Sequence, residues 1–204
     1  MKNYQLLLII FSFFISSAYS QIDESNFNSD TIKNRLERLN TKTPIELYFT
    51  PSVEKTIKRY LNTRLEFYEK NIDRINYYLP LFEEQLQNQK IPLEIKYLPI
   101  IESRLDPFAV SKVGATGLWQ FMFYTALENG LTMNSYVDER MDPFKSTQAA
   151  AAYLNKLYKT HNDWNLVLAS YNAGPRTISR AKKKSGGYTN YWNMRPFLPS
   201  ETAN

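Results

Sequence analysis

Apolar side chains recur at steps of three and four residues along most of this chain, which is the spacing of one helix face. The longest stripe of this kind runs from Val53 to Leu86, and Pro80 within it predicts a kink or a break. Alternation of apolar and polar residues is nowhere long enough to predict a strand. We interpret the side chains of the stripe as core packing. The pattern therefore predicts a mainly α protein.

Capping residues divide the rest of the chain into shorter helices. A short helix is predicted from Thr31 to Leu39, with Asp30 as its N-cap. Asp142, followed by a proline, and Asp163 are typical first residues of two later helices. Beyond the long stripe, the predicted helices run over residues 92–103, 117–129, 143–159, 164–172 and from 175 to the glycine pair at 186–187.

The first twenty residues have the composition of a signal peptide. Lys2 supplies a positive start, residues 6–15 form an apolar run, and residues 16–20 are mostly small. A membrane span needs about 20 apolar residues, so this run is short for one. We predict an exported protein whose mature chain begins at Gln21; an uncleaved anchor is the alternative. The sequence holds no cysteine, which excludes disulfides, a thiolate metal site and a lipid-anchored cysteine.

Composition places limits on the partners. The chain has 204 residues and a formal net charge of +5, a balance that suits an anionic polymer such as wall glycan, nucleic acid or a membrane surface. The most basic segment, residues 180–184, has the character of an exposed helix end rather than of a nucleic-acid-binding arm. We expect one or at most two domains, with a polar linker over residues 21–50 that contains the short helix.

A carboxylate at the end of an apolar helix is the first candidate for chemistry. Glu102 follows Ile100 and Ile101 in the segment PIIES. Apolar surroundings disfavour the charged form, so the pKa of such a carboxyl rises toward the value that a general acid needs. The alternative is an ordinary solvated glutamate, since carboxylates at helix ends are common.

Two later segments add polar groups suited to a glycan. In the segment GATGLWQFM at residues 114–122, two glycines permit a tight loop, and Gln120 offers both a donor and an acceptor to sugar hydroxyls and acetamides. In the segment ASYNAGP at residues 169–175, Tyr171 stands where one helix ends and another begins. Its position does not decide between a role in a cleft and packing.

These segments, in this order, resemble the motifs of the soluble-lytic-transglycosylase (SLT) domain family, and within it the membrane-bound lytic murein transglycosylase D type. The resemblance covers roughly residues 44–204 and rests on PLE at 92–94, PIIES at 99–103, GATGLWQFM at 114–122 and SYNAGP at 170–175. It implies a lysozyme-like helical domain with a glycan cleft over residues 91–204. Residues 51–90 are then an N-terminal helical extension.

The resemblance also implies roles for single residues. Glu102 is the catalytic acid/base, and Ser111 contacts the acetamide of N-acetylmuramic acid. Gln120 and Met122 line the cleft. Tyr171 lies near the catalytic glutamate, and Glu201 is a second cleft carboxylate that binds rather than reacts. Ser103 is expected to support the helix end.

The implied reaction uses a single acid. Glu102 protonates the bond between N-acetylmuramic acid and N-acetylglucosamine, the substrate's own acetamide attacks, and a 1,6-anhydro ring closes without water. No cofactor and no metal are expected; His161 is interpreted as a surface residue and Asp106 as a turn cap. The expected partner is the peptidoglycan glycan strand, not nucleic acid, and the only membrane contact is that of the transient signal peptide.

The chain departs from the family pattern at Phe123, where proline is usual, and at Arg176, where glycine is frequent. The family also continues past the Glu-Thr pair at 201–202 with a further helix, and this type often carries LysM repeats. We therefore expect the last helix of the domain to be missing from residues 91–204. Three alternatives stay open: a lysozyme-type hydrolase, a catalytically weak peptidoglycan-binding module, and a structural helical scaffold.

Overall fold

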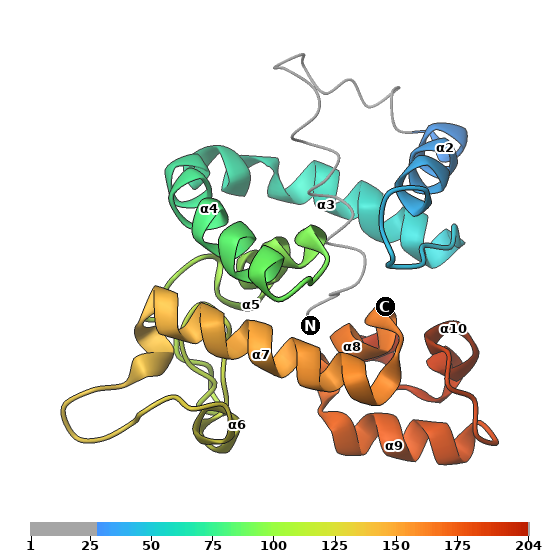
Figure 1. Cartoon of the computed structure of the whole chain (residues 1–204). Helices are drawn as coiled ribbons and strands as arrows, with labels where there is room; N and C mark the ends of the chain where they lie inside the picture. The colour runs from blue at the N-terminus through green and yellow to red at the C-terminus, as the bar shows by residue number, and fades with distance from the viewer. Residues whose placement is uncertain (1–27, 204) are drawn as a thin grey trace. The chain divides into compact units, whose positions relative to one another are not determined.

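The computed structural model describes residues 28–203, apart from the side chains of residues 62–66. The predicted signal peptide and its cleavage point before Gln21 lie outside the described residues. The chain divides into two compact units, whose helices are labelled in Figure 1. Unit 1 joins residues up to 70 with residues from 161 onward, and unit 2 is the segment 71–160.

The N-terminal part of unit 1 holds two helices, α2 (Ser29–Asn40) and α3 (Pro51–Lys70). The predicted short helix is therefore present, but its cap is Asn28, whose side chain accepts from the N–H of Thr31 at 2.8 Å. The prediction of Asp30 as the cap was wrong, because the helix starts earlier and Asp30 lies in its first turn.

The C-terminal part of unit 1 is a series of short helices: α8 (Trp164–Ala173), α9 (Pro175–Lys184), α10 (Tyr191–Met194), η4 (Arg195–Phe197) and α11 (Ser200–Ala203). The predicted cap Asp163 is confirmed, since its Oδ1 accepts from the N–H of Leu166 at 3.1 Å. Its Oδ2 accepts from the N–H of Tyr191 at 2.9 Å. One carboxylate thus fixes the start of α8 and the start of α10.

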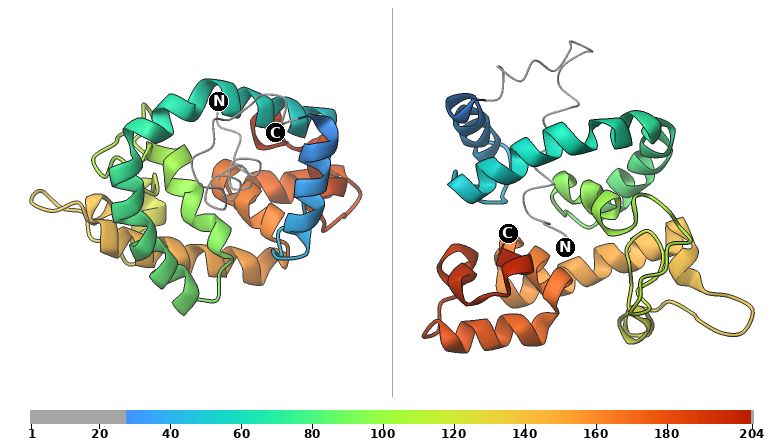
Figure 2. Two further views of the ribbon diagram at one scale, coloured as in Figure 1. Left: turned by 90° about the horizontal axis from the view of Figure 1, so that it is seen from above. Right: turned by 180° about the vertical axis from the view of Figure 1, so that it is seen from behind.

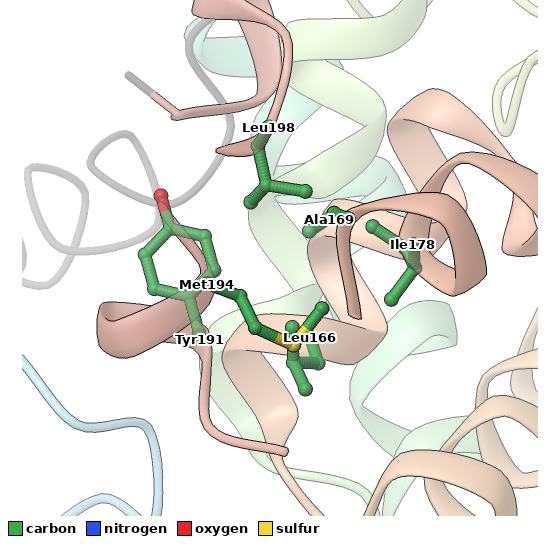
Figure 3. Packing of buried hydrophobic residues seen from close by; sticks show 7 residues of the cluster. Leu166, Ala169, Ile178, Tyr191, Met194 and Leu198 are labelled. Carbon is green, nitrogen blue, oxygen red and sulfur yellow. The ribbon is translucent and has the colours of Figure 1, made fainter. Parts of the chain in front are cut away.

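A hydrophobic cluster holds these helices together. Figure 3 shows its side chains gathered from α8, α9, α10 and the chain that follows. The buried members are Leu166, Ala169, Ile178, Ala181, Tyr191, Met194 and Leu198. Short helices gain little stability of their own, so this apolar burial is what keeps them in place.

Unit 2 contains α4 (Ile72–Asn88), η2 (Leu93–Tyr97), α5 (Leu98–Ser103), α6 (Phe123–Glu128), η3 (Glu139–Met141) and α7 (Pro143–His161), whose last residue belongs to unit 1. Helix α4 continues through Pro80, so the chain does not break there, and the kink that was predicted as the other possibility stays a prediction. The predicted cap of α7 is confirmed, because Asp142 Oδ1 accepts from the N–H groups of Phe144 and Lys145.

The predicted helix over residues 117–129 is only partly present. Its second half forms α6, which ends before Gly130 as expected. Residues 117–122 instead belong to a tight loop that runs from Ser111 to Met122. The loop forms isolated bridges from Val110 to Thr116 and from Thr116 to Phe121. Figure 2 shows the chain between α6 and α7 as a long extended loop in yellow.

The core of unit 2 forms around the indole of Trp119, which is fully buried. Its ring meets that of Phe82 from α4 edge to face at 5.4 Å, and its Nε1 donates to Thr147 Oγ1 of α7 at 2.9 Å. The loop that bears Trp119 is thereby anchored between two helices.

The expected mainly α class is confirmed: within residues 28–203, bridges occur but no strand does. Over the same part of the chain, no helix combines the length and the apolar character that crossing a membrane requires.

Candidate functional site

Glu102 occupies the last turn of the short helix α5 and is buried, with 9% of its surface exposed. Its neighbours Leu98, Pro99 and Ile100 are buried too. The expectation of an acid within apolar surroundings is therefore met, and the solvated glutamate is not what the structure contains. The expected rise in its pKa stays a prediction.

The helix ends directly after Ser103 in an unusual turn. Arg104 and Leu105 both have left-handed backbones, with φ of 57° and 58°, a conformation that residues other than glycine rarely adopt. Leu105 is fully buried, so packing holds the turn despite this strain. The turn fixes where α5 stops and hence where Glu102 lies.

Ser103 supports the helix end, as predicted. Its Oγ lies 3.0 Å from the carbonyl oxygen of Pro99 and 3.0 Å from that of Leu118. The first contact is within α5 and the second reaches the loop before α6. Ser103 therefore ties the helix of Glu102 to the loop that carries the candidate substrate-binding residues. The predicted turn cap is also present, with Asp106 Oδ1 accepting from the N–H of Phe108 at 3.0 Å.

Ser111 begins the tight loop and is half-buried. Its N–H donates to the carbonyl of Ala115 at 2.8 Å, and the N–H of Ala115 donates to Ser111 Oγ at 3.0 Å. The second contact uses one lone pair of the hydroxyl oxygen and leaves its hydrogen for another acceptor. An acetamide carbonyl of a sugar is such an acceptor.

Gln120 has a left-handed backbone with φ of 50°. Its Nε2 donates to the carbonyls of Ala109 and Gly117, at 3.2 and 3.0 Å. The amide donors therefore brace the loop, and Oε1 is the atom of this side chain suited to a ligand. Met122, directly before α6, is 46% exposed, which fits a residue that lines a surface for a partner.

Arg140, from a second segment of unit 2, contacts this loop at three positions. Gly117 has φ of +82°, and a Cβ added there would lie 1.9 Å from the carbonyl oxygen of Arg140. The guanidinium of Arg140 donates through Nη1 to the carbonyls of Gly114 and Phe121, at 3.0 and 3.2 Å. Only glycine fits at 117, and Arg140 contacts both ends of the loop.

Arg140 is itself held by Asp138. Its Nη2 donates to Asp138 Oδ2 at 2.6 Å, and its Nε donates to Oδ1 at 2.9 Å. The side-chain hydrogen bond from Arg140 is the main reason why the pKa of Asp138 lies below its ordinary value. The carboxylate is therefore ionised and fixes the direction of the guanidinium.

Tyr171 and Glu201, the other two candidates, belong to unit 1. Tyr171 is half-buried near the end of α8, and Glu201 is exposed on α11. Their helices are joined beside these residues, because Thr202 Oγ1 donates to Asn172 Oδ1 at 2.9 Å. The structure thus brings the elements of Tyr171 and Glu201 together, as it does for Glu102, Ser111, Gln120 and Met122 in unit 2.

The interpretation of His161 as a surface residue was wrong. The imidazole is half-buried, and its Nε2 lies 3.1 Å from Oγ of the fully buried Ser170. Burial lowers its pKa below the ordinary value of 6.5. This contact joins the end of α7 to α8, one residue before Tyr171. Within the described residues, no group of three or more metal-ligating side chains is close enough to hold an ion.

Sequence reasoning missed Arg140, Asp138 and the pair of Asn172 and Thr202. Arg140 lies 19 residues beyond Phe121, whose carbonyl it binds, so local spacing gives no sign of the contact. The acid and base two positions apart at 138 and 140 were the available signal, although such pairs are common on surfaces.

Comparison with known proteins identifies the family of the chain. Residues 80–193 match the model of the transglycosylase SLT domain. The chain is 32% identical over 149 residues to the membrane-bound lytic murein transglycosylase D of Escherichia coli K12, covering 71% of this chain and 32% of that protein. It is 30% identical over 146 residues to the membrane-bound lytic murein transglycosylase F of Desulfosudis oleivorans, covering 66% and 31%.

A further relative is the membrane-bound lytic murein transglycosylase F of Maricaulis maris, at 34% identity over 113 residues, covering 50% of this chain and 23% of that protein. The chain thus spans about a third of the length of these relatives or less. The matched region contains Glu102, Ser111, Gln120, Met122 and Tyr171, while Glu201 follows it.

Proposed function

Because the chain belongs to the transglycosylase SLT domain family, we propose that it is an exported lytic transglycosylase of the cell envelope that acts on peptidoglycan. It cleaves the β-1,4 bond from N-acetylmuramic acid to N-acetylglucosamine and leaves a 1,6-anhydro-N-acetylmuramic acid end. Its catalytic domain covers residues 91–204. The reaction uses no metal and no cofactor.

The burial of Glu102 at the carboxyl end of α5 carries this proposal. Low solvent exposure and the negative end of a helix both favour the protonated form of a carboxyl group. A carboxyl that stays protonated near neutral pH can donate its proton to a glycosidic oxygen. Ser103 links this helix end to the loop of Ser111 and Gln120, so acid and sugar-binding groups share one support.

The mechanism needs only one acid. Glu102 donates its proton to the leaving oxygen while the acetamide carbonyl of the muramic acid attacks the anomeric carbon. The resulting carboxylate then takes the proton from the C6 hydroxyl, whose oxygen bonds to the anomeric carbon and closes the anhydro ring while the acetamide oxygen leaves that carbon. This hydroxyl belongs to the reacting sugar, and a well-oriented intramolecular group acts at an effective concentration of roughly 10⁵ M or more, far above that of water.

The remaining residues bind the glycan in this proposal. Ser111 donates its hydroxyl hydrogen to the acetamide, while Gln120 and Met122 line the cleft. Tyr171 and Glu201 bind sugars of the same glycan strand. The join between Asn172 and Thr202 supports the last two roles, because it keeps α8 and α11 together.

Digestion of purified peptidoglycan in ¹⁸O-labelled water tests the reaction. The expected muropeptides are lighter by one water than lysozyme products and carry no label at the anomeric carbon. Glu102→Gln is expected to keep the fold and to lose about 10² to 10⁴ in rate or more, since one group serves as acid and as base. Glu201→Gln is expected to lose less.

The alternatives give different products. Label in most chain ends would make the protein a lysozyme-type hydrolase. Binding of peptidoglycan without any cleavage would make it a binding module. Cleavage by Glu102→Gln at the wild-type rate would remove Glu102 from the mechanism, whichever product forms.

A further inference from the structure

Asp138 orients the side chain of Arg140, which contacts the loop of the candidate site. Arg140 belongs to η3, and its side chain is 11% exposed. The fork of its guanidinium binds both oxygens of Asp138, whose Oδ1 also accepts from the N–H of Arg140 at 3.1 Å. A planar guanidinium held at two points has a defined direction, so Nη1 points to one place.

Nη1 points to the two stretches of chain that approach each other at the base of the loop before α6. Nη1 donates to Gly114 O and Phe121 O, which stand at the two ends of the segment that contains Gln120. Phe121 O also accepts from the N–H of Thr116 at 3.0 Å, so the same oxygen closes the loop from inside. The cation lies 5.9 Å from the ring of Phe123, at the position where this chain departs from the family pattern.

The backbone of Arg140 limits the loop as well. Its carbonyl oxygen lies against Gly117, where the space excludes a Cβ. The loop is therefore in contact with both the guanidinium and the main chain of one residue. Between these contacts Gln120 adopts its strained backbone, a conformation that persists only where the surroundings enforce it.

We propose that Arg140, oriented by Asp138, is a positioning residue that sets the geometry of the glycan-binding loop from Ser111 to Met122. This inference rests on the proposed function. Arg140 does not react; it acts through Gln120 and Ser111. Lysine is a poor substitute, because its ammonium is a point charge that lacks the fork able to hold Asp138 and both carbonyls together.

The test measures glycan binding separately from turnover. A peptide-free tetrasaccharide of alternating N-acetylglucosamine and N-acetylmuramic acid is titrated into Glu102→Gln, with and without Arg140→Lys. We expect Kd to rise about 10- to 100-fold with Arg140→Lys, because the misaligned loop loses about one or two of its hydrogen bonds to the glycan, each worth roughly tenfold in affinity. Faster hydrogen exchange at the amides of Thr116 and Phe121 should accompany the loss.

A matched control separates positioning from general destabilisation. Lys96 and Glu83 form another ion pair of unit 2, and the Lys96 side chain is 14% exposed, close to the value for Arg140. Lys96→Met should lower the melting temperature and leave the exchange of Thr116 and Phe121 unchanged, with Kd less than threefold from its parent. If Arg140→Lys does not fold, Asp138→Asn, which removes only the orienting carboxylate, is expected to raise Kd by about 3- to 10-fold.

Each possible result either supports or overturns the role of Arg140. Weaker binding and faster loop exchange in Arg140→Lys alone support the inference. Kd within twofold of the parent in Arg140→Lys overturns it, and so does an equal loss in Lys96→Met at equal stability. A wild-type protein that neither binds nor cleaves the glycan overturns the proposed function instead, and the exchange data then still show whether Arg140 orders the loop.

Discussion

The two units hold their candidate residues by different means. In unit 2, Ser111, Gln120 and Met122 lie on an irregular loop that polar contacts fix: Ser103 binds Leu118 O, and Arg140 binds Gly114 O and Phe121 O. In unit 1, Tyr171 and Glu201 lie on helices that pack through a buried apolar cluster. Directional bonds define the first region, and apolar area defines the second.

The difference predicts how each region tolerates change. A hydrogen-bonded loop depends on donors and acceptors at set positions, so even conservative substitutions there lose contacts. An apolar cluster tolerates swaps that conserve volume and loses stability in proportion to the volume removed. We therefore expect catalysis to be most sensitive to backbone changes in unit 2 and folding stability to caps and packing in unit 1.

The largest effect is expected at Gly117. Gly117→Ala places a Cβ 1.9 Å from the carbonyl oxygen of Arg140, and this main-chain atom cannot turn aside. We expect kcat/KM on soluble glycan strands to fall about 100-fold or more, as for other misplaced binding groups.

Gly114→Ala is the matched control for this loop. Gly114 has the same φ of +82° but has no atom within 4 Å of an added Cβ. Its cost is the left-handed backbone alone, about 1–2 kcal/mol of stability. Equal losses of activity in the two variants would mean that backbone strain, and not the contact with Arg140, makes glycine necessary.

The same contrast explains what the sequence could predict. Helices α7 and α8 were predicted because Asp142 and Asp163 cap them locally and the apolar spacing follows. Residues 117–122 were predicted as helix and are a loop, because partners distant in sequence, such as Arg140 and Thr147, decide their conformation. Local rules carry no information on those partners.

The candidate site follows the same division. The burial of Glu102 could be inferred from its apolar neighbours, and the support from Ser103 from its place at the helix end. The clamp of Arg140 and the bond from Thr202 to Asn172 could not, since each joins segments that no periodic pattern connects. His161 was misjudged for the same reason, because its contact with Ser170 comes from the next helix.

A smaller effect is expected at the start of α8. Asp163→Ala removes the cap of α8 and the acceptor for Tyr191 N–H at once. We expect a loss of about 2–3 kcal/mol in the free energy of unfolding, of which roughly 1–2 come from the cap and about 1 from the second bond. Urea denaturation followed by circular dichroism measures it.

Asn28→Ala provides the comparison within unit 1, because the Asn28 side chain caps α2 by accepting from the N–H of Thr31. Its expected cost is about 1 kcal/mol. If both variants lose the same amount, the bond to the N–H of Tyr191 adds nothing to the stability of the protein.

The smallest effect expected is the dependence of folding stability on pH. The two units differ in the pH range over which each loses stability. In unit 1, burial lowers the pKa of His161 below 6.5, so the unfolded chain binds the proton more readily than the folded one. The stability this group contributes is fully present above pH 6.5 and declines as pH falls toward the folded pKa. In unit 2, the pKa of Asp138 is lowered below 3.8, chiefly by Arg140, so its contribution persists until the medium is more acidic than that.

His161 is the single histidine of the sequence, so its imidazole resonance gives the folded pKa directly by NMR titration. Urea denaturation of the wild type and of His161→Gln at pH 8, 6.5 and 5 then measures the linkage. We expect the difference in unfolding free energy between the two proteins to shrink as pH falls from 6.5 to 5, because only the wild type exposes on unfolding an imidazole that takes up a proton. A difference independent of pH, or a folded pKa at or above 6.5, would mean that burial does not keep the ring neutral and that both units respond to acid through their carboxylates.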